Sequence, residues 1–440
     1  CMGTPDQPSP AAASPVRSHA FATQMAVAPP RVALADVVRL LVSEDVGGWG
    51  VLKDGKDQVE SVTCEESAET EWHQVMMLTC PLQGVSQGRL VVHIPAWTGA
   101  ALESRALASR AFSDAGIGPS LLADVWMPVG SDRRRVMVSE YLAGGTLTPV
   151  EFLDGDLMAS VGRLYGRLHA SLPPSDWFLA KALPALSAEG AFQEGSGPDP
   201  GPWASCLWIL SWLLRQVPAK NRAALAAAGV DWDFVAAEIV SLPSKAVSGL
   251  LPFNGLLGRT ATVHGDSHGG NVMRDGSGKL RLIDFDMTAA GPAGSEFGFL
   301  VLMLFRCGIA PEQVVPREVQ RRFVAGYLEE CAAVTGDDGV GATESVEECA
   351  AVTGDDGVGA TESVEELLFG MHCWGYTGLL KMGLLCAVLM ENEGHAGKRE
   401  VMRSRGPVLL NPGFLKAAQD VIRRARGGDV ASRDDLLSRG

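Results

Sequence analysis

The segment from Thr262 to Asp286, TVHGDSHGGNVMRDGSGKLRLIDFD, governs the interpretation of this chain. It carries two histidines, four aspartates and one asparagine between apolar pieces that are typical of strands. We expect one strand to end at Val263, and the pieces on either side of RDGSGK to pair as a β-hairpin. Such a hairpin would carry Asn271 and Asp284 to the same end, near Asp266.

These three polar side chains suit phosphoryl transfer. The carboxylate of Asp284 and the amide oxygen of Asn271 are hard ligands of the kind that Mg²⁺ takes, since Mg²⁺ is usually held by one or two carboxylates together with substrate phosphates. Asp266 would then accept a proton from an attacking hydroxyl. The spacing Asp-x-x-x-x-Asn, with an aspartate at the end of the next strand, matches the catalytic loop of kinases. The alternative is a polar loop that is capped by its own side chains.

Composition limits the possible functions. The 440 residues carry a net charge of −15 and are 46% hydrophobic, which allows a sizeable core and argues against a nucleic-acid-binding surface. The nine cysteines include no CxxC pair, so neither a zinc site nor a disulfide framework is indicated. No apolar run reaches the ~20 residues of a membrane span, and Lys381 interrupts the apolar stretch 378–390. We expect a cytoplasmic protein, or an organellar one if the tail 1–34 is a targeting segment rather than a disordered one.

Two parts of different periodicity follow the tail. Residues 35–142 combine strand-like pieces with a helix at 100–116, and residues 143–440 are mainly helical in periodicity. The strand-like pieces are 58–64, 72–80, 88–95, 120–126 and 134–142. We therefore expect an α+β fold with a small N-terminal sheet lobe and a larger helical C-terminal lobe.

One internal repeat is perfect. EECAAVTGDDGVGATESV occurs at 329–346 and again at 347–364. A solenoid needs at least three repeats, so the copy indicates a tandem duplication. Its spacing does not put carboxylates at the ligand positions of a calcium loop. We expect a duplicated surface insertion over 329–364, because lengthening a loop costs little entropy.

The motif HGDSHGGN followed by IDFD resembles the aminoglycoside phosphotransferase and choline kinase superfamily of protein-kinase-like small-molecule kinases. The resemblance extends over most of 35–440. It includes ESRALASRAFSDAGIGPSLLADVW, VSEYLAGGTL and GRLYGRLHASL. It implies a two-lobed protein-kinase-like fold, with nucleotide binding by the N-terminal lobe and with catalysis and substrate binding by the C-terminal lobe. It also implies ATP and Mg²⁺ as cofactors and a small-molecule hydroxyl substrate.

The resemblance assigns roles within the motif. Asp266 would be the catalytic base, and His264 would hold the catalytic loop by hydrogen bonds. Asn271 and Asp284 would be the Mg²⁺ ligands. Asp286 stands where some members carry a second acid, so it would either assist the metal or be a solvated or capping residue.

Nucleotide-binding roles fall on the N-terminal lobe. Glu140 and Leu142 would offer backbone groups to adenine, and Glu103 would pair with a phosphate-binding cation. Two positions depart from the family pattern: His93 stands where Lys or Arg is expected, and Glu296 stands where an aspartate usually braces the catalytic loop. Pairing with Glu103 would keep the imidazole of His93 charged. The glycine-rich stretch DVGGWG at 45–50 is a candidate phosphate loop.

Three functional hypotheses remain open. The first is a Mg-ATP-dependent kinase for a hydroxyl group of a small metabolite. The second specifies the acceptor of such a kinase: choline or ethanolamine, an aminoglycoside-like amino sugar, or methylthioribose. The third is a pseudokinase that binds nucleotide or a partner without catalysis, which His93 favours and the intact Asp266, Asn271 and Asp284 oppose. For the acceptor, the tryptophans could either cage a quaternary ammonium group or pack in the core. These tryptophans are Trp203, Trp208, Trp212 and Trp374.

Overall fold

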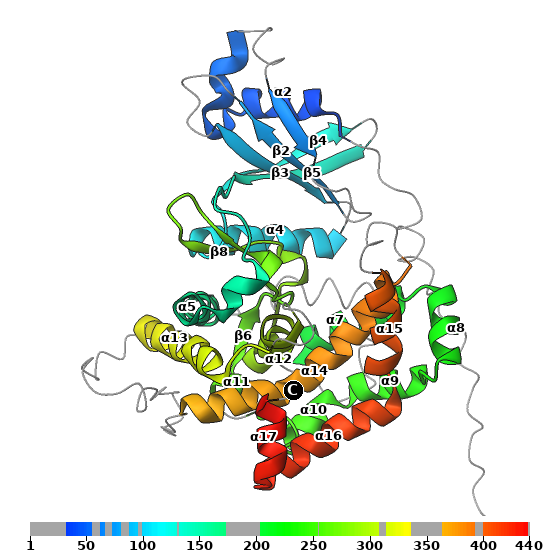
Figure 1. The fold of residues 1–440 in the computed structure, drawn as a ribbon. Coiled ribbons are helices and arrows are strands. Elements are labelled where there is room, and N and C mark those ends of the chain that lie inside the picture. The colour runs from blue at the N-terminus through cyan, green and yellow to red at the C-terminus, as the bar shows by residue number, and fades with distance from the viewer. Residues whose placement is uncertain are drawn as a thin grey trace, which may run out of the picture.

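The structure is a computed structural model. It describes residues 32–54, 62–66, 73–80, 88–95, 99–129, 132–172, 203–253, 255–307, 314–335, 363–391 and 399–438. The predicted two-lobed arrangement is confirmed (Figure 1): a small antiparallel sheet lies above a larger, mainly helical lobe. Each lobe has its own hydrophobic core.

The N-terminal lobe is built on a five-stranded antiparallel sheet of order β1-β2-β3-β5-β4. Its strands are β1 (Thr63–Glu66), β2 (His73–Thr79), β3 (Arg89–Pro95), β4 (Leu121–Val129) and β5 (Asp132–Glu140). Four of these match the predicted pieces closely, and β1 begins later than expected. Side chains alternate along β3, so Leu90, Val92 and Ile94 are buried in the lobe's core. Val91 and His93 consequently point to the opposite face of the sheet.

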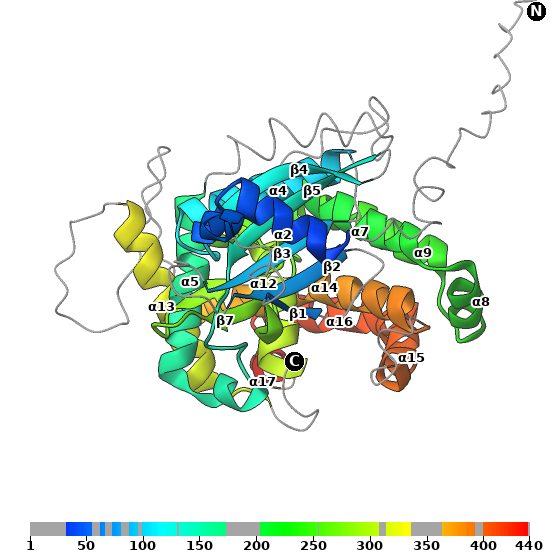
Figure 2. The same ribbon diagram turned by 90° about the horizontal axis from the view of Figure 1, so that it is seen from above.

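The core face of the sheet is covered by α2 (Leu34–Ser43) and the 3₁₀ segment η1 (Val46–Asp54), which lie across it in the view from above (Figure 2). Val37, Leu41 and Trp49 are fully buried against the strands. The stretch DVGGWG therefore packs the lobe's core through Trp49. None of its residues lines the pocket between the lobes, so it is not a phosphate loop.

Helix α4 (Gly99–Asp114) lies at the junction of the lobes (Figure 1), where the sequence predicts a helix. Ala108 and Phe112 belong to the core of the lower lobe although they come from the N-terminal part of the chain. The ring of Phe112 packs on that of Phe285, with centroids 4.3 Å apart. The helix therefore connects the sheet to the catalytic segment.

Two helices that are far apart in sequence form the most extensive contact of the lower lobe. These are α5 (Gly155–Ser171) and α13 (Arg317–Thr335). A Cβ at Gly162 would collide with the carbonyl of Phe323, and one at Gly326 would collide with that of Ala159. Glycine at both positions lets the two backbones approach closely, and this contact fixes α5 behind the catalytic segment.

The pair lies at one side of the lower lobe, and the remaining helices make up the rest of it (Figure 1). They are η2 (Pro149–Leu153), α7 (Ala204–Gln216), α8 (Ala219–Ala227), α9 (Trp232–Val240), α10 (Leu242–Val247), α11 (Gly255–Gly258), α12 (Ala293–Leu300), the π-helical η7 (Val301–Cys307), α14 (Val364–Leu389), α15 (Arg399–Leu409), α16 (Pro412–Arg426) and α17 (Val430–Ser438). No helix of the described segments is long and apolar enough to cross a membrane.

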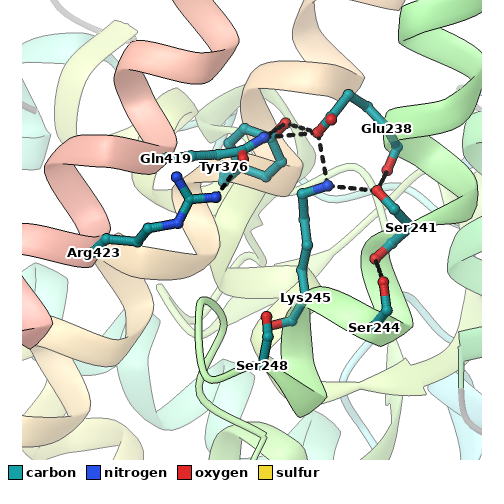
Figure 3. A network of polar contacts seen from close by, with 8 residues as sticks. All are labelled: Glu238, Ser241, Ser244, Lys245, Ser248, Tyr376, Gln419 and Arg423. Carbon is teal, nitrogen blue, oxygen red and sulfur yellow. Dashed lines mark hydrogen bonds and ion pairs between the residues drawn. The ribbon is translucent and has the colours of Figure 1, made fainter.

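A polar network joins the outer helices to α14 (Figure 3). The carboxylate of Glu238 on α9 accepts hydrogen bonds from the hydroxyl of Tyr376 on α14 and, at 2.8 Å, from Nε2 of Gln419 on α16. Nζ of Lys245 on α10 lies 2.9 Å from the same carboxylate. A half-satisfied buried network destabilises a fold, whereas this one gives Glu238 three donors.

Two tryptophans of the lower lobe, Trp203 and Trp374, pack in the core. Trp203 stacks on Trp374 at 5.1 Å and on Phe253 at 5.7 Å, and Nε1 of Trp374 donates to the carbonyl of Pro252. Both tryptophans are almost wholly buried. These two tryptophans therefore pack in the core and do not form a cage for a quaternary ammonium group. The side chain of Trp208 lies outside the described residues.

The duplicated stretch is not wholly a surface insertion. Its first seven residues, 329–335, continue α13, where Cys331 is buried. Its last two residues begin α14, where Ser363 caps the helix. Residues 336–362, like the tail 1–31, lie outside the described residues.

Candidate active site

The catalytic segment folds as predicted. Strand β6 (Thr260–Val263) leads into the HGDSHGGN loop, and a hairpin of β7 (Val272–Arg274) and β8 (Leu280–Leu282) follows. The chain then passes through η6 (Phe285–Met287) into β9 (Ala289–Pro292), which pairs antiparallel with β6. This return closes the loop against the strand it left. Gly265 has φ +79°, and a Cβ there would collide with the carbonyl oxygen of Met287.

Asp266 and Asn271 are directly bonded. Nδ2 of Asn271 donates to the backbone oxygen of Asp266 at 2.9 Å and to its carboxylate at 3.1 Å. Both bonds use the amide nitrogen, so the amide oxygen of Asn271 is the atom that can face a cation. Burial alone would raise the pKa of Asp266, but the hydrogen bond from His268 and the charge of Lys381 outweigh it and hold that pKa below its usual value. Asp266 is therefore a carboxylate at neutral pH.

His264 holds the loop, as the resemblance implies for this residue. Its Nε2 donates to the carbonyl of Ile283 at 2.8 Å, and its Nδ1 accepts from the backbone N–H of Asp266 at 3.2 Å. Burial lowers the pKa of the imidazole, which fits this neutral tautomer. The ring thus ties the Asp266 loop to the strand that ends at Asp284, and it touches neither carboxylate as an acid or a base.

Glu296, the first-turn residue of α12, braces the same loop from below. Its carboxylate accepts hydrogen bonds from the backbone N–H groups of His264 and Gly265 and from the hydroxyl of Ser267. Burial raises the pKa of Glu296 to about 7, against the opposing effects of the Gly265 bond and the charge of Lys381. The longer side chain therefore occupies the bracing position that the sequence suggested for it.

Asp284 adopts a left-handed backbone conformation, with φ 64° and ψ 73°. Aspartate is one of the few residues besides glycine that tolerates this region, and such residues cluster at functional sites. Ile283, the residue before it, donates its N–H to the carbonyl of Asn271 at 3.0 Å. Asp284 Oδ1 is buried and has no hydrogen-bond partner among the described residues. An unpartnered buried carboxylate oxygen beside Asn271 is what a Mg²⁺ ligand would require.

Asp286 is engaged by a different partner from the one expected. Its carboxylate forms an ion pair with the guanidinium of Arg105 on α4. The same guanidinium donates from Nη2 to Nδ1 of His93 on β3. An imidazole that accepts at Nδ1 is neutral, so His93 does not act as the charged phosphate clamp that pairing with Glu103 would have produced. The geometry gives Asp286 the role of holding Arg105.

Glu103 does not pair with His93. It reaches Nη1 of Arg135 on β5 at 2.8 Å and is more than half exposed. Arg135 is also held by Asp124 through two bonds of 2.6 and 2.7 Å. Glu103 and Arg105 are two residues apart on a helix and therefore point in different directions. Arg105 faces the site, and Glu103 faces away from it.

Arg105 is the cation that sequence reasoning missed. Its side chain is 7% exposed, and its Nε is buried without a hydrogen-bond partner among the described residues. Burial lowers its pKa to about 10, partly offset by the charge of Asp284, so the guanidinium stays charged at neutral pH. The available signal was the spacing of Leu102, Arg105, Ala106 and Ser109, which places the arginine on the buried face of α4.

A pocket of about 340 Å³ lies between the lobes and collects these groups. Its apolar walls come from both lobes and include Met77, Leu121, Met273 and Phe285. His93, Arg105 and Asp284 line it, and so do Glu140 and Leu142. An apolar pocket with a few convergent polar groups is the usual form of a small-molecule site.

Glu140 and Leu142 line the pocket at the connection between the lobes, and their contact with adenine stays a prediction. The N–H of Glu140 donates to the carbonyl of Ser120 at 3.0 Å. The carbonyl oxygen is therefore the backbone group that Glu140 can offer. Segment 144–147, which follows, bonds to β7: the N–H of Leu147 donates to the carbonyl of Val272. This bond connects the lobe junction to the catalytic hairpin.

The described residues contain no cluster of three or more His, Cys, Asp or Glu side chains that could hold a metal ion. A Mg²⁺ site needs only one or two protein carboxylates when phosphates complete its shell. Asp284 and the amide oxygen of Asn271 fit that requirement.

Lys381 on α14 also belongs to this site. Its Nζ lies 3.9 Å from Oδ1 of Asp266 and 4.0 Å from the centre of the Phe299 ring. The residue is 7% exposed, and burial lowers its pKa. The sequence signal was a lone lysine in the apolar stretch 378–390, but the separation of Lys381 from Asp266 along the chain concealed the contact.

Comparisons with known proteins bear on the family and the fold of the chain. The model of the APH family, the phosphotransferase enzyme family, matches residues 86–333, more than half of the chain. The fold is similar to that of a choline kinase from Cryptosporidium parvum, with a TM-score of 0.57 and 12% identity over 91% of this chain and 99% of that one. It is similarly close to an ethanolamine kinase from Plasmodium vivax, with a TM-score of 0.55 and 11% identity over 90% and 98%. No curated protein matches the sequence. At these identities the structures show a shared fold, whereas the family match shows membership: the chain belongs to the phosphotransferase enzyme family.

Proposed function

We propose that the protein is a Mg-ATP-dependent kinase that phosphorylates a hydroxyl group of a small metabolite. One observation carries the proposal: the bonded pair of Asp266 and Asn271 and the unpartnered oxygen of Asp284 meet at one hairpin beside the interlobe pocket. A base and two hard oxygen ligands next to an apolar pocket are the groups that phosphoryl transfer from a nucleotide requires.

The pocket suits ATP in one orientation. The adenine would lie between the apolar walls, near the backbone groups of Glu140 and Leu142. The phosphates would then point toward Arg105 and Asp284. Asn271 and Asp284 would hold Mg²⁺, which when bound supplies positive charge to the phosphate oxygens.

The chain's own contribution to the chemistry centres on Asp266. The acceptor hydroxyl oxygen forms a bond to the terminal phosphorus, the bond from that phosphorus to the ADP oxygen breaks, and the hydroxyl proton passes to the Asp266 carboxylate. The depressed pKa keeps Asp266 ready to accept a proton but makes it a weak base. A weak base suits a loose transition state, in which the hydroxyl loses its proton late.

Arg105 bears on the pseudokinase alternative. That alternative rested on His93 standing where a basic residue was expected. A charged guanidinium that lies beside His93 and lines the same pocket supplies the missing positive charge from the helix instead of the strand. The geometry therefore supports an active kinase.

Substitution of the base tests the proposal. Asp266→Asn should lower turnover by roughly 100-fold or more, because general-base catalysis contributes on this order. Mg-ATP affinity should stay close to that of the parent. ADP release would be followed with a panel of small alcohols, and Asp233→Asn on the exposed face of α9 would serve as the control. Parent-like turnover in Asp266→Asn would refute the assignment of the base, and no turnover of any alcohol by the parent would refute the proposed activity.

A further inference from the structure

A second, smaller cavity borders the Asp266 loop at Gly265. It has a volume of about 40 Å³ and is enclosed by α7, α12, α14 and the β6–β9 pair. Gly265, Cys206, Ser295, Phe299, Thr377 and Lys381 are among the residues that line it. The volume corresponds to about three water molecules, which is enough for one small polar group of a ligand.

Lys381 is the only charged side chain in the described lining of this cavity. Its ammonium carries three N–H donors, yet it makes no hydrogen bond to any other described residue. It lies 3.9 Å from the carboxylate of Asp266 and over the face of the Phe299 ring, and it also interacts electrostatically with the buried carboxylate of Glu296. The side chain is more than nine-tenths buried. A buried ammonium without hydrogen bonds is costly, and an oxygen atom of a ligand in the cavity would relieve that cost.

The neighbouring hydroxyl groups have already used their protons. The Ser295 hydroxyl donates to the carbonyl of Pro292 at 2.7 Å, and that of Thr377 donates to the carbonyl of Trp374 at 2.9 Å. Lys381 is therefore the principal donor that this cavity offers to a ligand.

The same lining disfavours a quaternary ammonium group. Such a group has a permanent positive charge, no lone pair for Lys381 to bond, and a need for open aromatic faces. Phe299 is the one aromatic residue of the described lining, and its face is already covered by the Lys381 ammonium. Trp203 and Trp374 are stacked on each other in the core and do not line the cavity.

We propose that this cavity is the acceptor subsite, and that Lys381 selects an acceptor that presents a neutral or anionic oxygen atom and rejects alcohols that carry a quaternary ammonium group. The inference rests on the proposed function, because it takes Asp266 as the base for the acceptor hydroxyl. The proposed acceptor, neutral or anionic, differs from choline and ethanolamine, for which the two similar structures are named.

Three probes of similar size separate charge from shape. Choline and 3,3-dimethylbutan-1-ol have the same shape and differ in the positive charge, and 4-hydroxybutanoate carries a carboxylate. Dissociation constants would be measured by calorimetry in the presence of Mg²⁺ and a non-hydrolysable ATP analogue, and kcat/KM from ADP release. The parent should bind choline on the order of 100-fold more weakly than the neutral alcohol, since two like charges about 5 Å apart repel strongly in a partly buried site.

Lys381→Met should reduce that discrimination to a few-fold, because it removes the charge and uncovers the Phe299 ring. It should also weaken 4-hydroxybutanoate binding by 10-fold or more. Lys381→Arg, which keeps the charge, should retain the parent's preference. Lys416→Met is the matched control, since Lys416 lies over the Phe234 ring at 5.3 Å on exposed α16. Lys381→Gln replaces the methionine variant if that variant does not bind the nucleotide analogue.

The outcomes are distinct. A parent that binds choline as well as its neutral isostere, or that binds none of the three probes, overturns the proposal. The proposal is also overturned if the ratio of the dissociation constants of choline and 3,3-dimethylbutan-1-ol is the same in Lys381→Met as in the parent. If the parent turns over no alcohol, the proposed kinase activity fails, and the calorimetric ratio still decides whether Lys381 sets the charge preference of the cavity.

Discussion

Removing the guanidinium of Arg105 should weaken nucleotide binding about 100-fold. A phosphate charge ~4 Å from a cation gains about 4 kcal/mol at the effective dielectric of a partly buried site. The ion pair with Asp286 weakens the attraction of Arg105 to a phosphate. We therefore expect Arg105→Met to lose about half of the 4 kcal/mol, or about 2 kcal/mol. Asp286 would then lie uncompensated near the phosphates, which adds about 1 kcal/mol. The total of ~3 kcal/mol corresponds to about 100-fold in Kd.

Calorimetry with Mg-ATP would measure this change directly. Arg105→Lys should recover most of the affinity because it keeps the charge. Arg110→Met is the matched control: Arg110 lies on the same helix, is mostly exposed, and pairs with Asp124 outside the pocket. A Kd within a factor of three of the parent in Arg105→Met, with an unchanged melting temperature, would show that the phosphates do not lie against this guanidinium.

Position 93 on β3 offers a second test of whether a cation at this place binds the nucleotide phosphates. His93 and Arg105 are hydrogen-bonded across the gap between β3 and α4. A lysine at 93 would therefore enter the space that the guanidinium leaves. His93→Lys in the Arg105→Met background should restore about 10-fold of the lost affinity, because it returns a cation from the strand side. Because His93 accepts a hydrogen bond at Nδ1 from Arg105, the parent's cation at this place is the guanidinium and not the imidazole.

Three further predictions address the metal site, the loop brace and the repeat. Asp284→Ala should weaken Mg-ATP binding itself and not only turnover, and unchanged calorimetric affinity would contradict the metal role. Burial raises the pKa of Glu296 from an ordinary 4.5 to about 7, so the folded state binds the extra proton, and the free energy of unfolding should fall by about 3 kcal/mol as pH rises from 4.5 to 7. The free energy of unfolding of Glu296→Gln, measured with urea at several pH values, should lack that fall. The same dependence on pH in parent and variant would refute the prediction. Deletion of 336–353 leaves one complete copy of the repeat and should change the melting temperature by no more than a few degrees, which thermal scanning would check.

The catalytic hairpin could be predicted because its information is local. Asp266, Asn271 and Asp284 lie within one strand–loop–hairpin unit, so turn chemistry and strand length place them together. The loop-holding role of His264 and the bracing role of Glu296 are instead what the resemblance to the kinase superfamily implies, and the hydrogen bonds of both residues fit those roles.

The cations could not be placed in the same way. Whether Glu103 or Arg105 faces the pocket depends on how α4 is rotated between two lobes, which is set by Phe112 and Ala108 packing into the lower core. Lys381 reaches Asp266 from a helix more than a hundred residues later in the chain. Its position depends on the packing of α14 against α12, and no local pattern records that packing.

The proposed role of Lys381 would make the polar network around Tyr376 part of acceptor selection, because both residues lie on helix α14. Tyr376, which is fixed by Glu238 and Gln419, precedes Lys381 by about 7.5 Å along the helix axis. A turn of α14 by 20° about its axis would move the end of a side chain by roughly 2 Å, comparable to the margin between contact and no contact with an acceptor. Substitutions in α9 or α16 that alter the hold on Tyr376 would therefore retune the choice of substrate from a distance, without altering any residue that lines the cavity.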